Sequence, residues 1–182
     1  MPPKPWKTLS SREVYKNPWA RVREDIAEMP NGRTTIYGVI ECGHAVGVLP
    51  FIDADHVALV RQYRYVFDEN QRWEMPTGGV KPGEPLEDAA RRECREEIGY
   101  DVAHLQKVSA YFSSKSILQE TCHLYIGRGL SLVEAMPDET EFLEVATFPF
   151  DQVVQMVVDS EIRDSMTVIA VLHAARLRTV AN

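Results

Sequence analysis

The sequence predicts an α+β fold in which a mixed β-sheet forms an α/β/α sandwich with helices and an antiparallel β extension precedes it. Two observations carry this prediction. Segments rich in β-branched residues dominate much of the chain and are interrupted by one helix after a Gly-rich loop, and the C-terminal segment shows helical periodicity. Strands and helices in this order are typical of a layered domain.

The first forty residues are expected to form β-structure, with a hairpin as its clearest element. Residues 21–29 alternate weakly in polarity, Asn31-Gly32 is a strong turn signal, and residues 34–40 are rich in β-branched and aromatic side chains. We therefore expect an N-terminal β extension over residues 1–43, placed before the main sheet.

The main domain, residues 44–182, is marked by apolar patterns. Two apolar, β-branched strands are expected at 45–52 and 56–63, separated by the turn sequence Asp53-Ala54-Asp55. The later elements are predicted in chain order as strands at 105–113, 121–128 and 142–148 and helices at 150–158 and 165–177.

Composition excludes several classes of function. The formal net charge of −7 argues against a protein that binds a nucleic-acid backbone, which would normally show a basic face. No apolar run approaches the length of a membrane span, and the first residues contain no apolar signal segment. The three cysteines, Cys42, Cys94 and Cys122, have no metal-binding spacing and suit a reducing compartment. We expect a cytoplasmic protein that binds neither nucleic acid nor membranes.

The segment with the clearest chemistry is a helix predicted at 85–98. Pro85 suits a first helical turn, and Gly99 is a natural terminator. Glu93, Glu96 and Glu97 are spaced i, i+3, i+4 and fall within an arc of about 100°. A solvated acidic face is the alternative interpretation. However, acids in the C-terminal half of a helix oppose its dipole, and clustered hard oxygen ligands suit Mg²⁺ or Mn²⁺.

The segment 78–100 resembles the Nudix box, G-x5-E-x7-R-E-U-x-E-E-x-G-U, where U is a bulky apolar residue. Every fixed position matches, and Cys94 is smaller than the usual aliphatic residue at its place. The matching residues are Gly78, Glu84, Arg92, Glu93, Cys94, Glu96, Glu97, Gly99 and Tyr100. By this resemblance the chain is identified as a member of the Nudix hydrolase superfamily, with the Nudix fold.

The resemblance implies roles for individual residues. Glu93, Glu96, Glu97 and the backbone carbonyl of Thr77 would be ligands of Mg²⁺, with Mn²⁺ as the other candidate ion. Glu84 and Arg92 would brace the turn between loop and helix, Arg92 by pairing with a carboxylate.

The residues before the box resemble the branch that hydrolyses ADP-ribose and nucleoside diphosphate sugars. About 77 residues precede the box, and in that branch the N-terminal strands help to form a homodimer. The segments 59–64 and 73–76 resemble the sequence context of this branch and supply candidate substrate-binding residues, namely Arg61, Tyr63, Arg64 and Glu74. A guanidinium matches phosphate geometry, although an ordinary ion pair, for instance with Glu74, is the alternative for each arginine. Tyr63 could stack on a base or pack in the core.

Two downstream segments complete the prediction. The loop 114–120 lacks the Pro and Gly that the ADP-ribose branch usually carries, which favours a broader sugar-nucleotide substrate such as ADP-ribose or GDP-mannose. The acidic segment 138–144 makes Glu139 and Glu141 candidates for the general base, with Glu97 and Glu96 as the other candidates, and makes Glu141 a further metal ligand. A solvated loop is the alternative for this segment.

The expected reaction is therefore hydrolysis of a nucleoside diphosphate sugar to a nucleoside monophosphate and a sugar phosphate. The alternatives are another nucleotide substrate, such as a nucleoside triphosphate or a dinucleoside polyphosphate, and a non-catalytic domain that binds a nucleotide.

Overall fold

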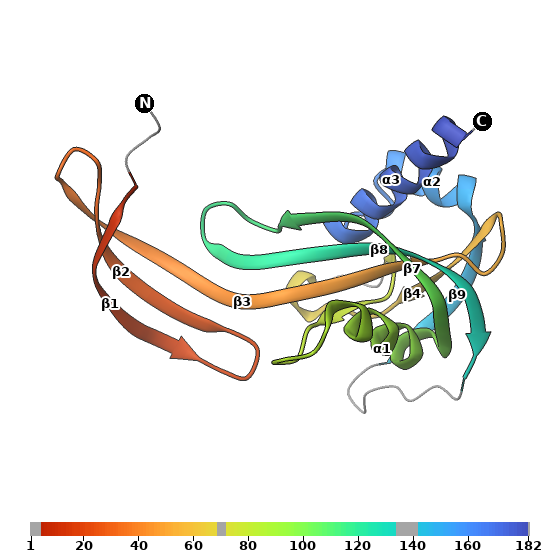
Figure 1. The fold of residues 1–182 in the computed structure, drawn as a ribbon, viewed down its shortest axis with the longest axis horizontal. Coiled ribbons are helices and arrows are strands. Elements are labelled where there is room, and N and C mark those ends of the chain that lie inside the picture. Colours follow the sequence, from red (N-terminus) through yellow and green to blue (C-terminus); the bar gives the residue numbers. More distant parts are fainter. Residues whose placement is uncertain (1–4, 69–71, 134–141, 182) are drawn as a thin grey trace. The chain divides into compact units, whose positions relative to one another are not determined.

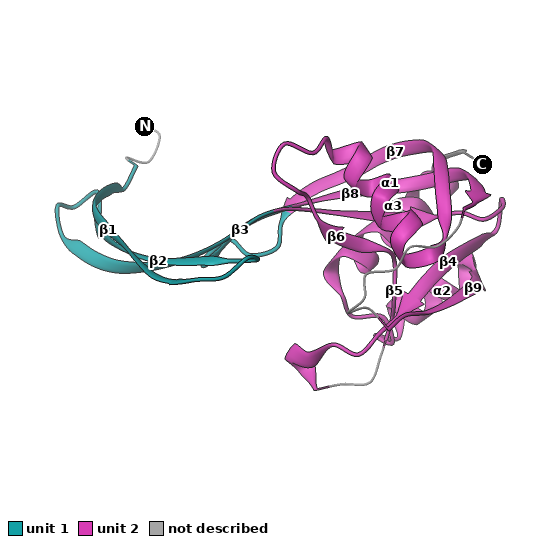
Figure 2. Cartoon of the chain, turned by 90° about the horizontal axis from the view of Figure 1, so that it is seen from below, with its two compact units in different colours: residues 1–43, 112–121 teal, residues 44–111, 122–182 magenta. Residues whose placement is uncertain are grey.

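The computed structural model describes residues 5–68, 72–133 and 142–181. The chain divides into two compact units, shown in different colours in Figure 2. Unit 1 contains Met1–Gly43 and Phe112–Thr121, and unit 2 contains His44–Tyr111 and Cys122–Asn182. The prediction had assigned the segment 112–121 to the main domain together with the strands on either side of it.

Unit 1 is built on an antiparallel sheet of β1 (Lys7–Lys16), β2 (Arg21–Glu28) and the first part of β3 (Thr34–Pro50). The predicted hairpin of β2 and β3 is confirmed, with Gly32 at φ +80° in its turn. Strand β1 was not predicted as a separate element, because all of its residues are exposed and none of the apolar alternation of a half-buried strand is present.

Ion pairs between neighbouring strands stabilise this sheet. Arg21 on β2 donates to Glu13 on β1 and to Glu41 on β3, both at 2.9 Å. Arg23 donates to Glu41 as well, at 2.8 Å. Opposite charges that face each other across strands replace part of the apolar packing that a thicker domain would provide.

The strands in the described part of unit 2 belong to two sheets, the first of which is the 6-stranded sheet that also includes β1 and β2. In the first, the second part of β3 pairs with β6 (Thr77–Gly79) and with β8 (Leu118–Leu132), which in turn pairs with β7 (Tyr100–Phe112). In the second, β4 (His56–Arg61) lies between β5 (Trp73–Glu74) and β9 (Glu144–Pro149). A short 3₁₀ helix, η1 (Tyr65–Phe67), lies between β4 and β5 in the chain.

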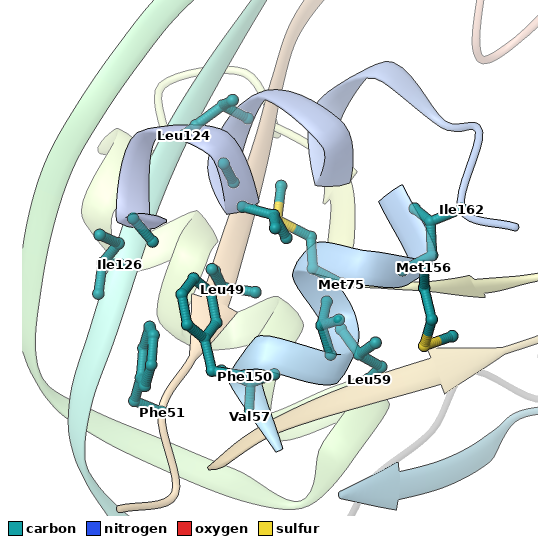
Figure 3. Close-up of a cluster of buried hydrophobic side chains, with 14 residues drawn as sticks. Leu49, Phe51, Val57, Leu59, Met75, Leu124, Ile126, Phe150, Met156 and Ile162 are labelled. Carbon is teal, nitrogen blue, oxygen red and sulfur yellow. The ribbon is translucent and has the colours of Figure 1, made fainter. Parts of the chain in front are cut away.

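The α-helices in the described part of unit 2 are α1 (Leu86–Ile98), α2 (Phe150–Val158) and α3 (Ser165–Ala181) (Figure 1). Residues of β3 alternate between two buried clusters, because successive side chains of a strand point to opposite faces. Val46 and Val48 pack with α1, whereas Leu49 and Phe51 pack with α2 and α3 (Figure 3). The predicted α/β/α layering is therefore confirmed within unit 2.

Two glycines lie where these strands pass closest to their neighbours. A Cβ atom on Gly47 would lie 2.4 Å from the Met75 methyl group, and one on Gly127 would lie 2.9 Å from a methyl group of Val48. Both distances are shorter than real Cβ contacts, so a side chain at either position would displace its neighbour.

The helices begin and end close to the predicted residues, while the strands differ more. The predicted strands at 34–40 and 45–52 form one continuous strand of 17 residues, β3, with Gly43 at φ +85° within it. Glycine adopts this backbone conformation without steric cost, so pairing continues through a position where the sequence suggested a break. Among the helices of the described ranges, none is long and apolar enough to cross a membrane.

Candidate active site

The helix α1 has well-defined ends. Its N-cap is Pro85, with extended backbone angles of φ −63° and ψ 142°, and its C-cap is Gly99, at φ +69°. The Gly99 N–H donates to the Arg95 carbonyl at 3.2 Å, which satisfies one of the last carbonyls of the helix. Since the apolar stripe of Ala90, Cys94 and Ile98 is buried against the sheet, the rotation of the helix about its axis is fixed.

That rotation places two of the predicted metal ligands against β6. Glu93 and Glu97 are only 7% and 4% exposed. The Thr77 N–H donates to Glu97 at 3.2 Å, and a Cβ atom on Gly78 would lie 2.0 Å from Glu93 Oε1. Gly78 is therefore the position at which β6 and the Glu93 carboxylate approach most closely (α1 and β6 are labelled in Figure 2). Glu96, the third predicted ligand, is half-buried on the same helix.

Arg92 links these carboxylates to the loop before the helix. Its guanidinium donates to both oxygens of Glu84, at 2.8 and 3.0 Å, and to Glu93 and Glu96, at 2.6 and 2.9 Å. Its remaining N–H donates to the Gly79 carbonyl at 2.9 Å. All five guanidinium donors are therefore used within the protein. We call Glu84, Arg92, Glu93, Glu96 and Glu97 the carboxylate cluster.

The Arg92 contacts also determine the charge of Glu84. The hydrogen bonds from Arg92 lower the pKa of the Glu84 carboxyl from its ordinary 4.5 to about 2, and the Lys81 N–H, which donates to the same carboxylate at 2.9 Å, lowers it as well. The predicted bracing role of Glu84 and Arg92 agrees with this geometry.

The donor chemistry of the carboxylate cluster fits a divalent cation. The cluster holds four carboxylates and one guanidinium, and the guanidinium has no N–H left for a substrate phosphate. Carboxylate and carbonyl oxygens are the ligands that Mg²⁺ and Mn²⁺ prefer. Within the described ranges, however, no three His, Cys, Asp or Glu side chains already lie around one point that could hold a metal ion.

The predicted substrate-binding residues are engaged with other side chains. Arg61 donates to Glu144 at 3.1 Å, and its guanidinium lies 4.7 Å from the centre of the Trp73 ring. Arg64 donates to Glu74 at 3.0 Å. The suggested pair with Glu74 is therefore made by Arg64, while Arg61 pairs across the β4–β9 register with a residue 83 positions away in sequence.

Glu74 and Tyr63 differ in exposure. Glu74 is 8% exposed, and burial raises the pKa of its carboxyl against the lowering effect of Arg64. Tyr63 is half exposed, and its hydroxyl donates to Asp68 at 2.8 Å, which raises the pKa of the phenol. The ring of Tyr63 thus lies at the surface of unit 2.

Glu139 and Glu141 lie outside the described residues. The loop 114–120, which the prediction compared with a substrate loop, belongs to unit 1, where the Tyr37 hydroxyl donates to the Ser116 carbonyl at 2.8 Å. The sequence did not predict the contact between His44 and His123, which are 79 positions apart and whose ring nitrogens lie 3.1 Å from each other.

Comparisons with known proteins agree with this geometry. The family model for the NUDIX domain matches residues 43–167, and the model for the nucleoside diphosphate sugar hydrolase N-terminal domain matches residues 6–40. Both lie on the segments from which the resemblance was inferred.

Several curated proteins are similar over most of the chain. The methanol dehydrogenase activator of Bacillus methanolicus is 31% identical over 169 residues, which is 92% of this chain and 91% of that protein. The ADP-ribose pyrophosphatase of Bacillus subtilis (strain 168) is 29% identical over the same coverage. The ADP-ribose pyrophosphatase of Escherichia coli (strain K12) is 32% identical over 141 residues, 72% of this chain and 68% of that protein.

A solved structure described as an ADP compounds hydrolase has the same fold. It superimposes with a TM-score of 0.88 at 22% sequence identity and covers 100% of this chain and 98% of the other. The predicted fold class is confirmed by this match.

Proposed function

We propose that this chain, which belongs to the NUDIX family, hydrolyses the diphosphate of nucleoside diphosphate sugars such as ADP-ribose or GDP-mannose. The observation that carries the proposal is a complete box over residues 78–100, with its glutamates on α1, in the same chain as a match to the nucleoside diphosphate sugar hydrolase N-terminal domain. The ADP-ribose pyrophosphatases among its relatives support the same substrate class. The products would be a nucleoside monophosphate and a sugar phosphate.

The reaction requires one P–O bond of the anhydride to break while the oxygen of a water molecule bonds to phosphorus and loses a proton. When bound, a divalent cation neutralises the diphosphate oxygens and makes the water more acidic. We propose that Glu93, Glu96, Glu97, Glu141 and the Thr77 carbonyl hold Mg²⁺, with Mn²⁺ as a substitute. Positioning of the reacting groups then provides most of the catalysis.

The described residues of the cluster contribute rigidity. Arg92 fixes the Glu93 and Glu96 carboxylates by charge-assisted hydrogen bonds, and the Thr77 N–H fixes that of Glu97. The proton of the water would pass to Glu139 or Glu141, and otherwise to Glu97 or Glu96.

The substrate phosphates need positive groups outside the cluster, because Arg92 is already saturated. Arg61 is the better candidate, since its partner Glu144 is exposed and can give way to a phosphate. Arg64 is held by the buried Glu74, so we assign this ion pair to shaping the site near Thr77. Tyr63 is exposed, and we assign its ring to contact with the base or the sugar of the substrate.

We also propose that residues 1–43 form a dimerisation element beside a hydrolase domain over 44–182, and that the protein is a cytoplasmic homodimer. Unit 1 exposes large apolar side chains that a second copy would cover, namely Trp6, Leu9, Val14, Tyr15, Trp19 and Ile36. Light scattering of the purified chain tests the dimer, and a monomeric mass over the working concentration range contradicts it.

The substrate is tested by a panel assay in the presence of Mg²⁺. Wild type and the variant Glu96→Gln plus Glu97→Gln are incubated with ADP-ribose, GDP-mannose, a nucleoside triphosphate and a dinucleoside polyphosphate. Phosphate is measured after coupling to a phosphatase, except for the nucleoside triphosphate, whose hydrolysis is followed as pyrophosphate release because a phosphatase would attack it directly. We expect turnover of the two sugar nucleotides by wild type and its loss in the double variant. Full activity in the double variant contradicts the metal assignment, and preference for the other nucleotides contradicts the substrate class.

A further inference from the structure

Two histidines of unit 2 form a contact that the carboxylate cluster does not use. His44 Nδ1 on β3 and His123 Nε2 on β8 are 3.1 Å apart, and the ring centres are 5.2 Å apart. The two nitrogens therefore lie between the rings and face each other. One of them must carry a proton while the other offers its lone pair, so the bond exists only while at least one imidazole is neutral.

The surroundings of His123 favour its neutral form. The side chain is 8% exposed, and burial lowers the pKa of the imidazole below its ordinary 6.5. Among the described residues, the charged groups that act on it are Lys107 on β7 and His44 on β3, and both lower its pKa further. Its other nitrogen, Nδ1, is buried and has no hydrogen-bond partner in the same part of the chain. Protonation of both rings would therefore bring positive charges together at a poorly solvated position.

The backbone of His44 extends this contact to β6. The His44 carbonyl accepts a hydrogen bond from the Val80 N–H at 2.9 Å, and the pairing continues through Ala45 with Gly79 and onward along β6. Each residue of β6 contacts the carboxylate cluster, Gly79 by its carbonyl, Gly78 by its close approach to a carboxylate and Thr77 by its N–H. Hydrogen bonds therefore link the backbone of His44, through Val80 and β6, to the carboxylate cluster.

We propose that the hydrogen bond between His44 and His123 positions β6 beneath the carboxylate cluster, and that its loss when both rings are protonated sets the acid limit of hydrolysis. This inference rests on the proposed function. Both histidines are positioning residues, since neither is assigned a contact with the substrate or the metal. Below the pH at which the second proton binds, kcat falls toward the level of a protein that lacks the bond.

The experiment compares pH profiles of kcat and KM between pH 5 and 9 at saturating Mg²⁺. His123→Gln supplies an amide oxygen that accepts from His44 without titrating in this range. His123→Leu removes the bond, and His173→Gln, at an exposed position of α3, is the matched control. We expect His123→Gln to keep kcat at pH 8 within about threefold of wild type and to move the acid limb down by about one pH unit or more. We expect His123→Leu to lower kcat about tenfold or more across the range, with little change in KM.

Thermal stability gives a second readout. Because the pKa of His123 is lowered on folding, its contribution to stability is present above pH 6.5 and is lost as the pH falls through the lower, folded-state value. The Tm of wild type should therefore fall more steeply than that of His123→Gln between pH 7 and 5.

The outcomes distinguish failure of the proposed function from failure of the inference about His44 and His123. A wild type that turns over no sugar nucleotide contradicts the proposed function. An active wild type whose acid limb and Tm profile coincide with those of His123→Gln overturns this inference alone. If His123→Leu does not fold, the pH and Tm profiles of wild type and His123→Gln still test the inference.

Discussion

A substitution at Gly78 tests whether catalysis depends on the position of the Glu93 carboxylate, in a protein that remains folded. A Cβ atom at this position would lie 2.0 Å from Glu93 Oε1, whereas ordinary contact begins at 3.4 Å. In Gly78→Ala the carboxylate must therefore retreat by the difference, about 1.4 Å, and it gives up its 2.6 Å hydrogen bond from Arg92. The displaced group is the end of a flexible side chain, so the backbone can remain in place.

The two consequences differ in size. Overpacking of this kind costs about 1–3 kcal/mol, which leaves a domain with a stability of about 5–15 kcal/mol folded. A catalytic group displaced by about 1 Å costs on the order of 100-fold in rate, or about 2.7 kcal/mol of transition-state stabilisation. We therefore expect Gly78→Ala to remain folded and to lose about 100-fold in kcat/KM.

Gly79→Ala is the matched control. It lies next in the same strand, and a Cβ atom there meets nothing within 4 Å. Its kcat/KM should stay within about threefold of wild type, because only a residue that reaches the carboxylate can displace it. The assay is ADP-ribose hydrolysis, measured as the phosphate that a coupled phosphatase releases from the products, and it is repeated at increasing Mg²⁺ concentrations. Equal kcat/KM values for Gly78→Ala and Gly79→Ala would refute the reasoning, because Glu93 would then not need the position that Gly78 leaves open.

Three further predictions concern the same cluster. Arg92→Lys replaces a forked donor by a single ammonium, so urea denaturation should show a loss of about 2–3 kcal/mol in the free energy of unfolding. The matched control Arg176→Lys, at an exposed position of α3, should lose less than about 0.5 kcal/mol, and equal losses contradict the bracing role. The pKa of the Glu84 carboxyl is lowered to about 2, so this carboxylate stabilises the fold above pH 4.5 and loses the effect as the pH falls toward 2. The difference in Tm between wild type and Glu84→Gln should therefore narrow between pH 4.5 and pH 2. A constant difference argues against the ion pair. Chelation should reduce hydrolysis by about 100-fold, and adding Mg²⁺ should restore it. Glu97→Gln should need about 10–100-fold more Mg²⁺ for half-maximal activity than Glu87→Gln, a substitution at an exposed position of the same helix. An equal Mg²⁺ requirement would remove Glu97 from the ligand set.

The helix α1 was predictable because its signals are local. Pro85 and Gly99 determine its ends, and the buried stripe of Ala90, Cys94 and Ile98 determines which face packs on the sheet. Given that stripe, the spacing of the glutamates fixes their directions without any knowledge of distant residues. The positions of Glu93 and Glu97 on the inner part of the helix therefore follow from the sequence.

The partners of the arginines were less predictable because they depend on pairing across strands. Arg61 contacts Glu144 only because β4 pairs with β9, and nothing local to either strand specifies that register. The contact between His44 and His123 has the same origin, since β3 and β8 become neighbours only in the folded sheet. Strand β1 was missed for a different reason, which is that all of its residues are exposed and show no apolar alternation, although its backbone pairs with β2.

The glycines of the central strands bear on how the chain finds its native pairing. A strand that is apolar on both faces remains apolar on both faces after a slip of one residue, so hydrophobicity alone discriminates poorly between registers. Gly47 adds a steric preference to this choice, because a slip would place Val46 or Val48 against the Met75 methyl group and displace it. In the native register Gly47 pairs with Thr77 of β6, whose N–H donates to Glu97. The same strand alignment that leaves Met75 in place therefore brings the backbone of β6 to a carboxylate of the cluster.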